Sequence, residues 1–254
     1  MLGSLTSFRL AYMRLLAEAW SDKELERELL KSDDIMEILN NVKKPYYFSS
    51  PWPHIKVQLI KRDEVKWDPM ATAGWICPND YFIINLPTQN EAKGYEVQAL
   101  AAYYQEFPTL LGVNKKPDEN NKKDSVPYSV GGAIADLGID PTPFLEFGGV
   151  TLRALALAWK NTDPNNFRNE LFNNNLDDAT PVLSKYLGFN NPWNFMLQFV
   201  ESSEFTWDKD NHKWIHIPQN IIKMHYPPKP EKDEYMPIAL TSYNNTGPAY
   251  PFTC

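Results

Sequence analysis

The residue best suited to chemistry in this sequence is Cys254, whose thiol ends the chain. A deprotonated thiol is both a nucleophile and a metal ligand. The stretch before it is rich in residues that favour turns and loops, among them Asn245, Gly247, Pro248 and Pro251. We therefore expect an exposed tail that presents its thiol to another molecule, with a fortuitous terminal cysteine as the alternative.

The other reactive side chains follow no known catalytic motif. Cys77 precedes a predicted strand and has no histidine at a motif spacing, so we interpret it as a half-buried structural thiol. His212 and His216 are four residues apart, but the Trp-Ile pair between them indicates a strand rather than the helix of a metalloprotease. The remaining histidines are His54 and His225. Phosphate-binding loops and a G-x-S-x-G motif are absent, and we expect no catalytic residues, no metal and no cofactor.

The composition excludes several classes of protein. Aromatic residues make up 13% of the 254 residues, which is too many for a disordered chain. Two cysteines cannot build a disulfide scaffold or a four-cysteine metal site. A net charge of −7 argues against nucleic acid as a partner. Arg9 and Arg14 interrupt the N-terminal apolar stretch, so we expect neither a signal peptide nor a membrane span, and a cytoplasmic protein.

An internal repeat organises the elements that would position the tail. The segment R-L-L-A-E-A-W (14–20) matches R-A-L-A-L-A-W (153–159), and E-L-E-R-E-L-L (24–30) matches N-F-R-N-E-L-F (166–172). Four tryptophan pairs lie in register: Trp20 with Trp159, Trp52 with Trp193, Trp67 with Trp207, and Trp75 with Trp214. Residues that recur in register usually form the core of a duplicated unit, so we expect these tryptophans to be core residues.

The pattern divides the chain into four parts. We predict a first repeat at 1–111, a polar linker with a short helix at 112–147, a second repeat at 148–243 and a flexible tail at 244–254. Apolar residues at helical spacing predict two or three helices at the start of each repeat. Good N-caps are Asp22, then Asp33 or Asp34, and in the second repeat Asp163 followed by Pro164.

Period-two alternation follows the helices in each repeat. It is clearest around Val57 and Leu197 and predicts short strands. We therefore predict an α+β fold of two tandem repeats, each with two or three helices followed by a small antiparallel β meander.

The repeated segment resembles a known type of leader sequence. The stretch L-A-E-A-W-S-D-K-E-L-E-R-E-L-L (16–30) and its copy at 155–172 are similar to the leaders that resemble nitrile hydratase α-chains. The Leu-Pro and Tyr-Pro-Pro-Lys-Pro endings of the later strands, at 86–87 and 226–230, agree with that pattern. The C-x-L-C-S-C metal-binding motif of nitrile hydratase is missing, so hydratase activity and its metal are not expected.

The chain as a whole resembles the long precursors of thiazole/oxazole-modified microcins (TOMMs), a class of bacteriocin. The tail P-I-A-L-T-S-Y-N-N-T-G-P-A-Y-P-F-T-C is the most specific part of the match. The resemblance implies a substrate rather than an enzyme. A cyclodehydratase or other peptide-modifying enzyme would bind the folded part and modify Thr253 and Cys254, giving a thiazoline and a methyloxazoline. A protease and an exporter are further partners that the resemblance implies, with export of the processed product.

The resemblance also places the residues that the modifying enzyme would recognise. They lie in the repeated leader-like segment of each copy: Trp20, Asp22, Leu25 and Leu29 in the first, and Trp159, Asp163, Phe167 and Leu171 in the second. Three alternatives stay open: an inactive nitrile-hydratase-like binding or scaffold protein, an enzyme related to nitrile hydratase, and a different modification of Cys254.

Overall fold

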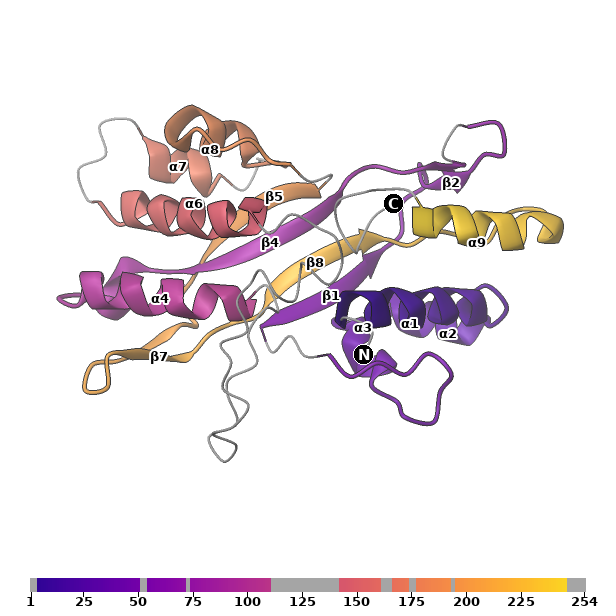
Figure 1. Cartoon of the computed structure of the whole chain (residues 1–254), viewed down its shortest axis with the longest axis horizontal. Coiled ribbons are helices and arrows are strands. Elements are labelled where there is room, and N and C mark those ends of the chain that lie inside the picture. Colours follow the sequence, from indigo (N-terminus) through magenta and orange to yellow (C-terminus); the bar gives the residue numbers. More distant parts are fainter. Residues whose placement is uncertain are drawn as a thin grey trace.

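A computed structural model shows a mixed α/β protein in which helices gather at both ends of a central sheet (Figure 1). The structure describes residues 4–50, 54–71, 74–110, 142–160, 166–173, 177–192 and 195–245. The described helices are α1 (Ser4–Ala19), α2 (Lys23–Lys31), α3 (Ile35–Leu39), α4 (Glu96–Leu110), α6 (Thr142–Ala158), α7 (Phe167–Leu171), α8 (Thr180–Leu187) and α9 (Met236–Asn245), with short 3-10 turns at Gln89–Ala92 and Asp233–Tyr235. The described strands are β1 (Ile55–Ile60), β2 (Lys66–Trp67), β3 (Trp75–Ile76), β4 (Asp80–Pro87), β5 (Phe195–Ser202), β6 (Thr206–Asp208), β7 (Lys213–His216) and β8 (Asn220–His225).

Aspartate side chains cap two of the described helices, α2 and α3. Asp22 accepts hydrogen bonds from the first free backbone N–H groups of α2, as the sequence predicts. Asp34, rather than Asp33, caps α3. In the second half α7 begins at Phe167, with no side-chain cap, whereas the predicted cap at Asp163 lies outside the described residues.

Two aspartates link a helix start to a strand. Asp34 Oδ1 lies 3.0 Å from the backbone nitrogens of both Met36 in α3 and Val57 in β1. Asp178 Oδ1 makes the same pair of 3.0 Å contacts, with Thr180 in α8 and Leu197 in β5. At each end of the molecule, one carboxylate oxygen thus connects the start of a helix to a strand.

The strand pairing differs from the predicted meander in each half. The central sheet has the order β1-β8-β4-β5, with β1 parallel to β8, β5 parallel to β4, and β4 antiparallel to β8. Only the hairpins β2–β3 and β6–β7 pair antiparallel within one half of the described chain. The predicted antiparallel meander is therefore wrong, because alternation of apolar residues fixes the face of a strand but not its partner.

The registers of the central sheet are symmetric about its middle. Ile55 pairs with Asn220, and Phe195 pairs with Asp80, so both members shift by the same 140 positions (55 to 195, 80 to 220). At the centre, Phe82 pairs with Ile222, which is its own counterpart at that offset (82 to 222). A residue that pairs with its own counterpart lies on a local two-fold axis.

The helices at each end of the sheet come from both halves of the sequence. Helix α4 contacts α6, and α9 contacts α1. Figure 1 shows α4 beside α6, α7 and α8 at one end, and α9 beside α1, α2 and α3 at the other. The predicted boundary between the linker and the second repeat, at residue 147, lies inside α6. The buried apolar residues of both halves belong to one cluster.

The expectation that the tryptophans are core residues is confirmed for most of the described ones. Five of them are buried: Trp20, Trp75, Trp159, Trp207 and Trp214. Trp67 is half-buried and its ring packs over Gly74, where a Cβ atom would lie 2.1 Å from Trp67 Cζ3. Gly74 also has a φ of +78°, so this turn requires glycine. Trp52 and Trp193 lie outside the described residues.

Candidate functional site

The helix that precedes the tail is fixed to the core. The indole Nε1 of Trp75 donates a hydrogen bond of 2.7 Å to the carbonyl oxygen of Ala239 in the middle of α9. The buried ring of Tyr243 lies 5.9 Å from Trp75 and 6.2 Å from Tyr12, between ring centroids. Both predicted modification residues, Thr253 and Cys254, lie outside the described residues. The helix before the tail thus packs against the core.

Two of the predicted recognition residues connect the halves of the chain. The indole Nε1 of Trp20 donates a 2.8 Å hydrogen bond to the carbonyl oxygen of Pro227. The indole Nε1 of Trp159 donates a 2.9 Å hydrogen bond to the carbonyl oxygen of Pro87. Trp159 therefore binds the last residue of β4, and Trp20 binds the segment just after β8. Each acceptor belongs to the opposite half, and both bonds are buried.

The remaining recognition residues divide between core and surface. Leu29, Phe167 and Leu171 are at most 2% exposed and cannot reach a partner in this conformation. Asp22 is exposed and Leu25 is half-buried, at the start of α2. Asp163 lies outside the described residues. Of the predicted recognition residues that the structure describes, Asp22 and Leu25 are thus the two that reach the surface.

These two residues line a groove between α2 and α3. The groove has a volume of about 670 Å³. Its lining residues include four carboxylates, two ammonium groups and three large apolar or aromatic side chains: Asp22, Glu24, Glu28, Glu37, Lys31, Lys44, Leu25, Ile38 and Tyr46. Sequence reasoning found one edge of this groove but not the groove, because α2 and α3 must pack before it exists.

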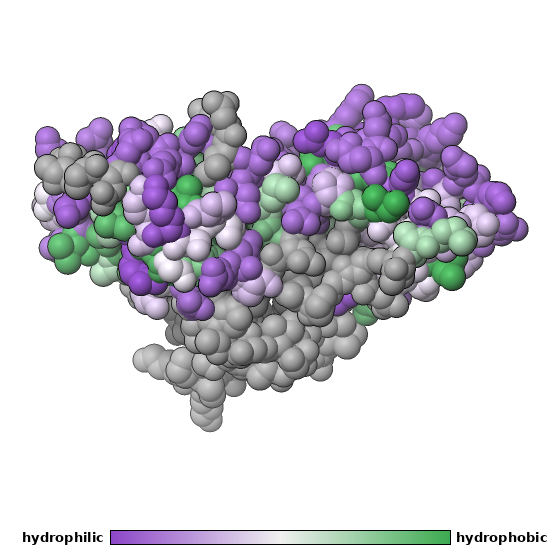
Figure 2. Space-filling model, turned by 90° about the horizontal axis from the view of Figure 1, so that it is seen from above, coloured by the Kyte–Doolittle hydropathy of each residue, from purple (hydrophilic) through white to green (hydrophobic). Residues whose placement is uncertain are grey.

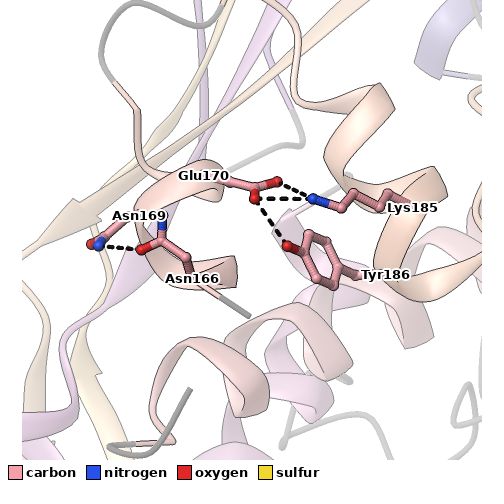
Figure 3. A network of polar contacts seen from close by, with 5 residues as sticks. All are labelled: Asn166, Asn169, Glu170, Lys185 and Tyr186. Atoms are coloured by element: carbon pink, nitrogen blue, oxygen red, sulfur yellow. Dashed lines mark hydrogen bonds and ion pairs between the residues drawn. The ribbon is translucent and has the colours of Figure 1, made fainter. Parts of the chain in front are cut away.

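In the second half, a polar network connects α7 to α8 (Figure 3). The ammonium Nζ of Lys185 lies 3.0 Å from both carboxylate oxygens of Glu170, and the hydroxyl of Tyr186 donates to Glu170 at 2.9 Å. Hydrogen bonding with Tyr186, and next with Glu170, raises the pKa of Lys185. Nearby, the Asn169 side chain donates to that of Asn166. The network keeps the Lys185 ammonium charged beside the carboxylate.

A buried Asp–His pair joins β4 and β8, the two central strands of the sheet, and sequence reasoning did not find it. Asp80 and His225 are 4% and 0% exposed, and His225 Nδ1 lies 2.9 Å from Asp80 Oδ1. The backbone N–H of His225 donates to the same oxygen at 2.8 Å. Burial raises the pKa of Asp80, and the contacts with His225 oppose that effect.

The equivalent place in the other half of the sheet is neutral. There the backbone N–H of Asn85 donates to Asn220 Oδ1 at 2.8 Å, as the N–H of His225 does to Asp80. A polar residue begins both strands, at Asp80 and at Asn220, and that is the signal that the sequence offers. The side chains of Asp80 and Asn220 each accept a hydrogen bond from a backbone N–H of the sheet, so we interpret the Asp80–His225 pair as structural.

The described residues contain no group of three or more metal-ligating side chains. Cys77 is half-buried, as predicted. Within the described ranges, no helix is long and apolar enough to span a membrane. Among the coloured residues of the face seen from above in Figure 2, polar ones predominate and apolar ones form separate patches.

Comparison with known proteins identifies a protein family. The model of a family described as a ribosomal natural product, two-chain TOMM family, matches the chain twice, at residues 3–111 and 142–251. No curated protein and no solved structure shows significant similarity to the chain.

Proposed function

Because the chain belongs to the two-chain TOMM family of ribosomal natural products, we propose that its folded part binds a maturation enzyme that modifies Thr253 and Cys254. The observation that carries this proposal is the family match over both halves, which reaches residue 251 and so includes the start of the tail. The resemblance of the 16–30 segment to nitrile-hydratase-type leaders supports the role of the folded part as a leader. Membership in a precursor family indicates a substrate rather than an enzyme.

The proposed chemistry is cyclodehydration by a partner cyclodehydratase. Sγ of Cys254 attacks the carbonyl carbon of Thr253, and a C–S bond forms. The carbonyl oxygen leaves with the thiol proton and the amide proton of Cys254, so that one water is lost and a thiazoline remains. The hydroxyl of Thr253 reacts in the same way with the carbonyl of Phe252 to give a methyloxazoline. ATP, used by the partner enzyme, drives the loss of water.

In this proposal the folded part binds the enzyme and the tail is the segment that is modified. The base of the tail is held by the Trp75–Ala239 hydrogen bond and the packing of Tyr243. Binding of the folded part to the enzyme then makes the encounter of the tail with the active site intramolecular. A precursor of this kind gains effective concentration from docking and needs no catalytic group of its own.

We also propose that the two halves are copies of one unit that have exchanged strands within a single chain. The separate family matches to each half support this proposal. So do the symmetric strand registers and the crossed bonds from Trp20 to Pro227 and from Trp159 to Pro87. Cleavage within residues 112–132 should leave the two fragments associated in one native particle on size-exclusion chromatography, whereas separation of the fragments would contradict the exchange.

Mass spectrometry of the full chain, co-expressed with a candidate cyclodehydratase from the same genome, tests the modification. We expect the loss of one water for each ring, mapped by fragmentation to residues 252–254. Cys254→Ala should abolish the thiazoline, and Thr253→Ala should abolish only the oxazoline. Cys77→Ala is the matched control, since its half-buried thiol is retained in the fold and should not affect the mass change. An unmodified tail in the presence of active enzyme would refute the proposal.

A further inference from the structure

The groove between α2 and α3 lies in the first half of the molecule, at the place that corresponds to α7 and α8 in the second half. Helix α3 ends at Leu39, whereas α8 continues to Leu187. Each helix begins within two residues of an aspartate that accepts a backbone hydrogen bond from its first turn, Asp34 for α3 and Asp178 for α8. The late part of α8, which holds Lys185 and Tyr186, therefore has no helical counterpart in α3. The shorter helix leaves the side of α2 uncovered, which is why a groove of about 670 Å³ forms there.

The second half shows what occupies the corresponding place when it is filled. In the alignment of the two repeated segments, Glu28 of α2 corresponds to Glu170 of α7. Glu170 binds the ammonium of Lys185 at 3.0 Å and the hydroxyl of Tyr186 at 2.9 Å (Figure 3). A cation and an amphipathic ring from α8 thus cover this carboxylate. In the first half, no cation of the described residues forms an ion pair with Glu28.

The charges of the groove favour a positively charged occupant. Asp22 uses one oxygen to cap α2, and Glu24 pairs with Arg27. Glu28 and Glu37 form no ion pair with another described residue. The floor is apolar, since Ile38 and Leu25 are half-buried and contact the core. An occupant therefore needs a basic side chain for the carboxylates and an apolar or aromatic one for the floor.

We propose that the α2–α3 groove docks a basic, partly apolar segment of the maturation enzyme, in the manner in which Lys185 and Tyr186 cover Glu170. This inference rests on the proposed function, because it assigns the surface at which the enzyme that modifies the tail binds. Charge complementarity supports this occupant: the carboxylates of the lining outnumber its ammonium groups, and the chain carries a net charge of −7. Docking at the first half leaves the tail, which follows α9, available to the active site.

The test is steady-state cyclodehydration of the purified full chain by the cyclodehydratase that modifies it, read as loss of water from the tail. Variant Glu28→Lys/Glu37→Lys reverses the two unpaired charges, and Glu28→Gln/Glu37→Gln removes them with little change of shape. The matched control is Glu64→Lys/Glu204→Lys, which makes the same charge change at exposed turn positions outside the groove. Circular dichroism and thermal unfolding establish that each variant is folded.

We expect the reversal variant to raise KM by about tenfold with kcat unchanged, and the neutral variant to raise it by a smaller factor. Added salt should raise KM of the native chain but not that of the reversal variant, because screening acts on the lost interaction. The control should keep the native KM. An unchanged KM in a folded reversal variant would overturn the groove assignment and leave the proposed function standing. Absence of modification in the native chain would overturn both.

Discussion

The crossed tryptophan bonds make a quantitative prediction about stability. Trp20→Phe removes the indole N–H that donates to Pro227 at 2.8 Å and leaves that buried carbonyl without its donor. An orphaned buried acceptor costs about 1–3 kcal/mol, and the smaller ring leaves a cavity. Together we expect a loss of about 2–4 kcal/mol in the free energy of unfolding. Trp159→Phe should cost a similar amount, because its 2.9 Å bond to Pro87 is the equivalent contact.

Trp207→Phe is the control that isolates the hydrogen bond. Trp207 is also buried, at 7% exposure, but its Nε1 has no hydrogen-bond partner among the described residues. Its replacement loses packing but no hydrogen bond, and it also removes a buried N–H without a partner. The loss for Trp20→Phe should therefore exceed that for Trp207→Phe by at least about 1–3 kcal/mol. Urea unfolding followed by far-UV circular dichroism measures all three variants without depending on indole fluorescence. Equal losses for Trp20→Phe and Trp207→Phe would refute the reasoning, and so would separate unfolding transitions for the two halves.

Three further predictions concern single residues. Asp34→Ala should cost about 2–3 kcal/mol in urea unfolding, because it removes both a helix cap and the acceptor for Val57. Asp178→Ala should cost the same within about 1 kcal/mol. A loss smaller than that of a helix cap alone would contradict the link to the strand. The free energy of unfolding of Asp80→Asn should rise relative to that of the native chain as the pH rises above 3.8. Burial raises the pKa of Asp80 in the folded state, so deprotonation weakens the native fold but not the variant. A difference between the two proteins that does not change with pH would contradict this prediction. Gly74→Ala should cost about 2 kcal/mol or more in thermal unfolding, through its φ of +78° and the Trp67 ring, and an unchanged melting temperature would show that the turn can relax.

Local sequence patterns determined which segments form helices and strands. Alternating apolar residues predicted β1 and β5, whose buried positions fall on one face of each strand. Aspartate at the start of an apolar helical stripe predicted the cap of α2. The tail and the leader-like segment predicted the precursor family, which the family match bears out. These signals are readable from the sequence because caps and alternation depend on residues within a few positions of each other.

Tertiary structure decided which segments meet. The sequence alone predicted that each half pairs its own strands, whereas β1 lies beside β8 and β5 beside β4. Strand alternation carries no information about the partner, since any strand with a matching apolar face satisfies it. The pairing then gave Trp20 and Trp159 their acceptors in the opposite half and brought Asp80 to His225. The α2–α3 groove likewise exists only because a short α3 packs against α2, which depends on the helix ends and their contacts together rather than on any one segment.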